Sequence, residues 1–148
     1  MHVLAPVKLF EDLSDQELSA LHHLAFPIKV EKDDYVFRED SLGRQIYVIL
    51  EGRVEILIER PAYQKEPLTL AVLETNEIFG EFSLFDDYAR SASAVAAEPS
   101  HLLEFHKTDL LEFFEKNNRI GMIVMRNLGK ILCERLRQTD TQIKGAVW

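Results

Sequence analysis

The chain has 148 residues, of which 47% are hydrophobic and 28% charged, as expected for one soluble domain with one substantial core. Its net charge of −8 disfavours direct binding to DNA, because phosphate contacts need a basic face, and no apolar run approaches the roughly 18 residues that span a bilayer. The single cysteine, Cys133, excludes an intramolecular disulfide and fits a cytoplasmic protein.

A short amphipathic helix is predicted near the N-terminus. Ser14 and Glu17 have the spacing of a capping box, in which the serine accepts from the third helical N–H and the glutamate reaches back. Leucines then recur at helical spacing until Pro27 ends the pattern. We therefore expect a short amphipathic helix of about three turns between Ser14 and Pro27.

The stretch over residues 27–106 has the pattern of a β core. Short runs of β-branched and apolar residues alternate with turn residues, which predicts a series of short strands. Gly52 supplies the positive φ that a tight hairpin turn needs between two of these runs. The strands that the pattern places are 28–30, 35–38, 46–50, 53–59, 68–73, 91–97 and 102–105.

Two helices are predicted after the strands. Thr108 is the expected N-cap of a short helix over residues 109–116, and Asn117 and Asn118 mark its end. The longer helix that follows has an apolar residue at every fourth position, so one apolar stripe runs along it. This stripe either packs entirely on its own chain or joins two copies in a homodimer. Its members are Val124, Leu128, Leu132 and Leu136.

The segment over residues 78–92 suits a small phosphate. Gly80 allows close backbone approach, the N–H groups of a short helix after it would point at the anion, and Arg90 would add a charge-assisted bond. Glu81 would repel the phosphate, so it needs a donor such as a sugar hydroxyl. The alternative is an ordinary surface ion pair between Glu81 and Arg90, worth at most about 1 kcal/mol.

The run Phe79-Gly80-Glu81-Phe82-Ser83-Leu84, followed by Arg90-Ser91-Ala92, resembles the phosphate-binding cassette of the cyclic nucleotide-binding domains. These domains occur in catabolite-activator-like (Crp-like) regulators, cyclic-nucleotide-dependent kinases and gated channels. The resemblance also includes the strand–turn–strand pattern over 47–54 and covers about residues 9–136.

The resemblance implies a mainly β fold with flanking helices in a single domain over residues 1–148. The lead-in over 9–25 would precede a jelly-roll-like β-roll, or double-stranded β-helix, over 27–106. Two C-terminal helices over 108–142 would form a lid. Because the lid helices follow the roll, we expect them to be attached at one end only and to move when ligand binds.

The resemblance also assigns roles within the cassette. Glu81 and the Gly80 backbone would hold the ribose 2′-hydroxyl, Arg90 and nearby backbone N–H groups would hold the cyclic phosphate, and the lid would cover the purine. Ser91 would bond the phosphate, contact the purine or merely begin a strand, and the first role is favoured. The implied ligand-binding residues are Gly80, Glu81, Phe82, Ser83, Arg90, Ser91 and Ala92.

We expect cAMP to be preferred over cGMP as the ligand. In the family a threonine after the arginine favours guanine and an alanine favours adenine, and Ser91 is intermediate. Asp87 stands where many members have glycine, and Ala89 where many have proline. Aspartate can adopt the left-handed conformation that such a turn needs, but Asp86 and Asp87 bring negative charge close to an anion site.

Enzymatic activity and a bound metal are not expected. A metal-dependent enzyme on a small β-barrel needs two or three converging histidines and a carboxylate. His22 and His23 are adjacent on a helix and diverge, whereas His101 and His106 lie at opposite ends of one strand. No Ser/His/Asp, Cys/His or Walker-type arrangement is visible.

Two other functions remain as alternatives. One is an interaction module of the same fold whose pocket binds nothing, although the presence of Glu81 and Arg90 disfavours it. The other is a transcription factor, which needs a helix-turn-helix domain of roughly 60–70 residues after the lid helix. Only twelve residues follow Leu136, so output passes through an unknown effector protein or this chain is part of a longer one.

Overall fold

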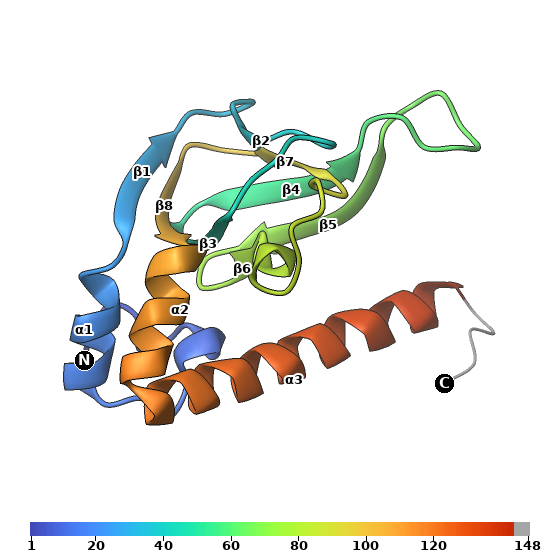
Figure 1. Ribbon diagram of the computed structural model, residues 1–148. Helices are drawn as coiled ribbons and strands as arrows, with labels where there is room; N and C mark the ends of the chain where they lie inside the picture. The colour runs from blue at the N-terminus through green and yellow to red at the C-terminus, as the bar shows by residue number, and fades with distance from the viewer. Residues whose placement is uncertain (144–148) are drawn as a thin grey trace.

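The computed structural model describes residues 1–143, which form a β-roll with helices before and after it (Figure 1). Two four-stranded antiparallel sheets make up the roll, as predicted. The elements are η1 (Lys8–Phe10), α1 (Asp15–His22), β1 (Phe26–Val30), β2 (Tyr35–Phe37), β3 (Gln45–Glu51), β4 (Arg53–Ile58), β5 (Leu68–Glu74), β6 (Ile78–Phe79), η2 (Glu81–Leu84), β7 (Ser93–Ala96), β8 (Ser100–His106), α2 (Lys107–Lys116) and α3 (Asn118–Ile143).

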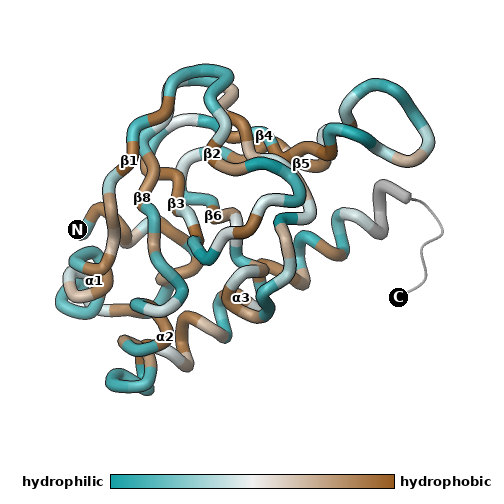
Figure 2. Tube along the Cα trace, turned by 45° about the horizontal axis from the view of Figure 1, so that its top comes forward, coloured by the Kyte–Doolittle hydropathy of each residue, from teal (hydrophilic) through white to brown (hydrophobic). Residues whose placement is uncertain are grey.

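The chain crosses repeatedly between the two sheets, whose strand orders are β1-β8-β3-β6 and β2-β7-β4-β5. Hydrophobic residues follow the strands, whereas the loop between β4 and β5 is largely hydrophilic (Figure 2). One buried cluster includes Tyr47 and Ile49 of β3 and Val54 of β4, and so draws on both sheets. A second cluster joins the roll to the helices. The roll is therefore a rigid frame around β3 and β6, the strands next to the cassette.

The capping box at the start of α1 is confirmed. Ser14 Oγ accepts from the Glu17 N–H at 3.2 Å, and Glu17 Oε1 accepts from the Ser14 N–H at 2.9 Å. The predicted N-cap of α2 is wrong, because β8 runs directly into that helix and His106, not Thr108, is the capping residue. The Lys107 N–H donates instead to the Arg44 carbonyl at 2.8 Å.

Two further element boundaries, the end of α2 and the start of β7, affect the C-terminal helices and the cassette. The predicted break between the last two helices is confirmed, since α2 ends at Lys116 and α3 begins at Asn118. The strand expected over 91–97 begins only at Ser93, so Ser91 and Ala92 belong to the cassette loop and the reading of Ser91 as the start of a strand is wrong.

The apolar stripe of α3 divides into two halves. Val124 and Leu128 are buried in the cluster that joins the roll to the helices. Leu132 is only partly buried, and the Leu136 side chain is 48% exposed. The first half therefore packs on its own chain, while the second half leaves apolar surface uncovered.

Helix α3 is also joined to the N-terminal lead-in. The Asn127 side-chain amide is buried and donates to the carbonyl oxygens of Leu9 at 3.0 Å and Glu11 at 2.9 Å. Arg126 pairs with Asp12 at 2.9 Å. The expectation that the C-terminal helices are attached at one end only is wrong, because these contacts tie the middle of α3 to η1 and to the turn after it.

We predict that Asn127→Ala destabilises the protein by about 1–3 kcal/mol, because the carbonyl groups of Leu9 and Glu11 lose their buried donor. Urea unfolding followed by circular dichroism measures this change. Lys130→Ala, at an exposed position of the same helix, is the control and should alter the free energy of unfolding little. Equal stability of the two variants would contradict the role of Asn127 as a tie.

Candidate functional site

The cassette begins at a glycine that the backbone requires. Gly80 follows β6 with φ 80°, in the left-handed region, and η2 starts at the next residue. A Cβ at this position would lie 2.9 Å from the Gln45 carbonyl oxygen and 3.0 Å from Arg90 Nη1. Gly80 therefore turns the chain and leaves room for the guanidinium beside it.

Arg90 is the buried cation of this site, with only 7% of the residue exposed. Its Nη1 donates to the Gly80 carbonyl at 3.2 Å and its Nη2 to the Gln45 carbonyl at 3.0 Å. The guanidinium carbon lies 4.1 Å from the centre of the Phe37 ring. The Nε–H is buried and has no hydrogen-bond partner among the described residues.

Desolvation lowers the pKa of Arg90, and the nearby groups Tyr47, Glu81 and Glu104 act in the opposite direction. A guanidinium stays charged in proteins at neutral pH. Because neutral carbonyl groups cannot cancel this charge, the site holds a buried positive charge with an unmet donor, a combination that attracts an anion.

A cavity of about 350 Å³ opens beside Arg90. Ile56, Leu70, Leu73 and Phe79 contribute apolar walls, and the cassette contributes the polar side. All seven residues predicted for the ligand site line this one cavity. They are Gly80, Glu81, Phe82, Ser83, Arg90, Ser91 and Ala92.

Glu81 is 7% exposed and pairs with a residue that the sequence analysis did not identify. Arg135 of α3 donates from Nη1 to Glu81 Oε1 at 3.0 Å and from Nη2 to the Ile78 carbonyl at 2.7 Å. The alternative of a surface ion pair between Glu81 and Arg90 is therefore wrong. Arg135 also lines the cavity, so α3 contributes directly to the site.

The side chains of η2 divide between the roll and solvent. The Ser83 hydroxyl is buried and has two carbonyl oxygens within hydrogen-bond distance, that of Gly80 at 2.8 Å and that of Gln45 at 3.2 Å, to either of which its one hydrogen can donate. Phe82 and Phe85 are 57% and 58% exposed, because η2 is a single short turn outside the roll. Phe82 lines the cavity with its neighbours, whereas Phe85 does not.

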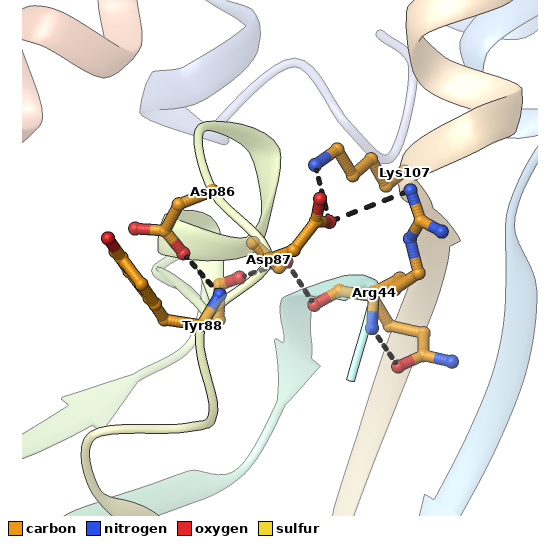
Figure 3. A network of polar contacts seen from close by, with 8 residues as sticks. Arg44, Asp86, Asp87, Tyr88 and Lys107 are labelled. Carbon is orange, nitrogen blue, oxygen red and sulfur yellow. Dashed lines mark hydrogen bonds and ion pairs between the residues drawn. The ribbon is translucent and has the colours of Figure 1, made fainter. Parts of the chain in front are cut away.

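The two acidic residues after η2 have separate partners (Figure 3). Asp86 accepts from the Tyr88 N–H at 3.1 Å. Asp87 lies between two cations, 3.3 Å from Lys107 Nζ and 3.7 Å from Arg44 Nη2. The φ of Asp87 is not positive, so this turn forms without a left-handed residue at that position. The charge of Asp87 is directed toward α2.

Two other features of the described residues limit the chemistry. Within residues 1–143, no group of three histidine, cysteine or acidic residues could hold a metal ion. No helix in the same part of the chain has both the length and the apolar character needed to cross a membrane.

Comparison with known proteins places this site in a family. The model of the cyclic nucleotide-binding domain matches residues 27–117, which include β1 except for its first residue, β2 to β8, the whole cassette and α2. The chain belongs to this family. The resemblance found in the sequence is confirmed, and the cyclic nucleotide-binding domain here is of the CRP-like regulatory type.

Two of the relatives are CRP-like regulators. The chain is 32% identical over 142 residues to the cyclic AMP receptor protein of Thermus thermophilus, covering 96% of this chain and 59% of the relative. It is 24% identical over 146 residues to a CRP-like cAMP-activated global transcriptional regulator of Mycobacterium tuberculosis, covering 99% and 62%. The chain thus spans about three-fifths of the length of these curated relatives.

Solved structures agree with this family. The catabolite activator protein of Thermus thermophilus has a TM-score of 0.79 at 31% identity, over 92% of this chain and 61% of that one. A cyclic nucleotide-binding domain from Methylobacillus flagellatus has a TM-score of 0.84 at 27% identity, over 95% and 78%. The prediction that the chain is not an enzyme is confirmed by relatives that are CRP-like regulators or isolated domains.

Proposed function

We propose that the chain is a single-domain cytoplasmic sensor that binds cAMP in preference to cGMP and transmits binding through α2 and α3. The observation that carries this proposal is Arg90, a buried guanidinium with an unpartnered Nε–H beside a cavity. The choice of cAMP is supported by the two relatives that are named for it. Ser91 is compatible with either purine.

The proposed contacts follow from the positions of the charges. Arg90 meets the cyclic phosphate, since it is the buried cation at the cavity and its carbonyl partners leave the charge uncancelled. Glu81 accepts from the ribose 2′-hydroxyl, because a carboxylate has several lone pairs and can serve a hydroxyl and Arg135 together. Ser91 and the backbone N–H groups near Phe82, Ser83 and Ala92 complete the polar side of the cavity.

Transmission of binding is proposed to run through Arg135. This residue touches both the cavity and Glu81, so ribose at Glu81 changes the contacts that hold α3. A ligand shifts an equilibrium only by contacts that differ between its two states, and α3 supplies such contacts. Because Asn127 and Arg126 tie α3 to the lead-in, the moving unit includes the N-terminal segment.

Output is proposed to pass to an effector protein or domain. The net charge of −8 disfavours direct DNA binding by these residues. The exposed half of the α3 stripe, at Leu132 and Leu136, is proposed to join two chains, because a homodimer would cover apolar surface that the chain itself leaves open.

The first test is calorimetry with cAMP, cGMP and a cyclic dinucleotide. We expect Arg90→Ala to lose about 2–5 kcal/mol of cAMP binding, because the desolvated phosphate loses its charge partner. Glu81→Ala should lose less, since its partner is a neutral hydroxyl. Arg53→Ala, whose side chain is 47% exposed and pairs with Glu74 outside the cavity, is the control.

Two results would contradict this assignment. Unchanged cAMP affinity in Arg90→Ala would remove the proposed role of the guanidinium. Absence of heat with all three nucleotides at millimolar concentration would favour the alternative of a same-fold interaction module with a non-binding pocket.

The second test is light scattering of the purified chain. We expect a dimer whose dissociation is promoted by Leu136→Glu, because a charge in an apolar contact is costly. Met122→Glu is the matched control, since Met122 is 63% exposed on the half of α3 whose apolar stripe is covered. A monomer at every concentration up to the millimolar range would reject the homodimer.

The third test is hydrogen exchange with and without cAMP. We expect slower exchange around residues 80–90 and a change within 119–140, with little effect in 46–59, which belong to the rigid roll. The lead-in around Leu9 should respond together with α3 because Asn127 joins them. Protection confined to the cassette would reject transmission through the helices.

A further inference from the structure

Asp87 brings three separate segments of the chain together outside the cavity (Figure 3). It lies in the loop after η2, and its Oδ1 is 3.3 Å from Nζ of Lys107, the first residue of α2. The same oxygen is 3.7 Å from Nη2 of Arg44, just before β3. The cassette loop thus contacts the start of α2 through one carboxylate.

The two ion pairs of Asp87 differ in how exposed the partner side chain is. The Lys107 side chain is only 11% exposed, whereas Arg44 is 64% and Asp87 75% exposed. An exposed pair contributes little, and the Lys107–Asp87 contact is itself exposed. The covered stem of Lys107, however, leaves its ammonium less freedom to move away from Asp87 than the exposed Arg44 has. Within the part of the chain that the structure describes, Asp87 is the carboxylate that pairs with Lys107. The contact to Lys107 is therefore the stronger constraint.

The loop that carries Asp87 also borders the ligand cavity. Asp86 and Tyr88, on either side, line the cavity, whereas Asp87 does not. The far end of the loop is fixed, because the Arg90 backbone exchanges hydrogen bonds of 2.8 Å with Asp40 and Ser41. The segment between η2 and Arg90 is therefore the part of the loop that a ligand in the cavity would contact, and Asp87 lies within it.

We propose that Asp87 is a positioning residue that couples the occupied cavity to α2. Its ion pair holds Lys107 to the cassette loop, so a displacement of the loop turns the start of α2 and, through α2, the helix that carries Arg135. This inference rests on the proposed binding of a cyclic nucleotide. The route lies outside the cavity and is separate from the contact between Arg135 and Glu81.

The test combines calorimetry with hydrogen exchange in Asp87→Asn and Lys107→Gln. We expect both variants to bind cAMP within about threefold of the parent, because the ion pair is outside the cavity. The cAMP-induced change in exchange over residues 107–116 and 119–139 should fall to about half or less, since the link that transmits it is broken. Exchanging the charges, with Asp87→Lys and Lys107→Asp together, should restore part of that change.

Arg44→Gln is the matched control, because it removes the exposed partner of the same carboxylate and should leave the helix response unchanged. A full helix response in both Asp87→Asn and Lys107→Gln, with cAMP bound, would overturn the coupling. A parent chain that gives no heat with cAMP would instead contradict the proposed function itself. Circular dichroism shows whether each variant is folded. If one of the single variants is not folded, the helix response of the charge-exchange variant still tests the coupling.

Discussion

The burial of the Arg90 guanidinium is the constraint on which the rest of the site depends. The charge is held by two backbone carbonyl groups and the Phe37 ring, so its position is set by the roll and not by a flexible acidic partner. This arrangement requires small neighbours. A Cβ at Gly43 would lie 2.6 Å from Arg90 Nη2, and one at Gly80 would lie 3.0 Å from Nη1. A cation fixed in this way loses little entropy when an anion arrives.

The sequence was sufficient where the physical signal is local. The capping box of α1 and the break after Lys116 lie within short runs whose residue types have direct backbone consequences, whereas the cassette from Gly80 to Ala92 was identified by its resemblance to a family. The N-cap of α2 was missed although it is local, because β8 continues directly into the helix at His106. The Lys107 N–H, which would otherwise be left to solvent, donates to the Arg44 carbonyl instead of requiring a side-chain cap.

Contacts between distant segments could not be read in the same way. Arg135 is 54 residues from Glu81, and its approach to the cavity depends on the direction in which α3 crosses the roll. The ion pair of Asp87 with Lys107 and the hydrogen bond of Asn127 to the Leu9 carbonyl also depend on how the C-terminal helices pack on the rest of the chain. A weak signal did exist for Arg135, since a buried carboxylate needs a cation or donor and the C-terminal segment is rich in basic residues. Composition indicates that a basic residue of this segment pairs with Glu81, but it does not identify which one.

The contacts of the cassette differ in whether they only add ligand affinity or also change the position of the helices. Arg90 is anchored to the roll, so a phosphate held there contributes affinity equally whatever the position of the helices. Only contacts that change with the helices can shift their equilibrium. Those contacts are Arg135 with Glu81 inside the cavity and Lys107 with Asp87 outside it. A ligand that contacted Arg90 without Glu81 would leave the Arg135 contact unchanged and would act on the helices only through the loop that carries Asp87. A ligand that also engages Glu81 acts on the residue that α3 presents to the cavity.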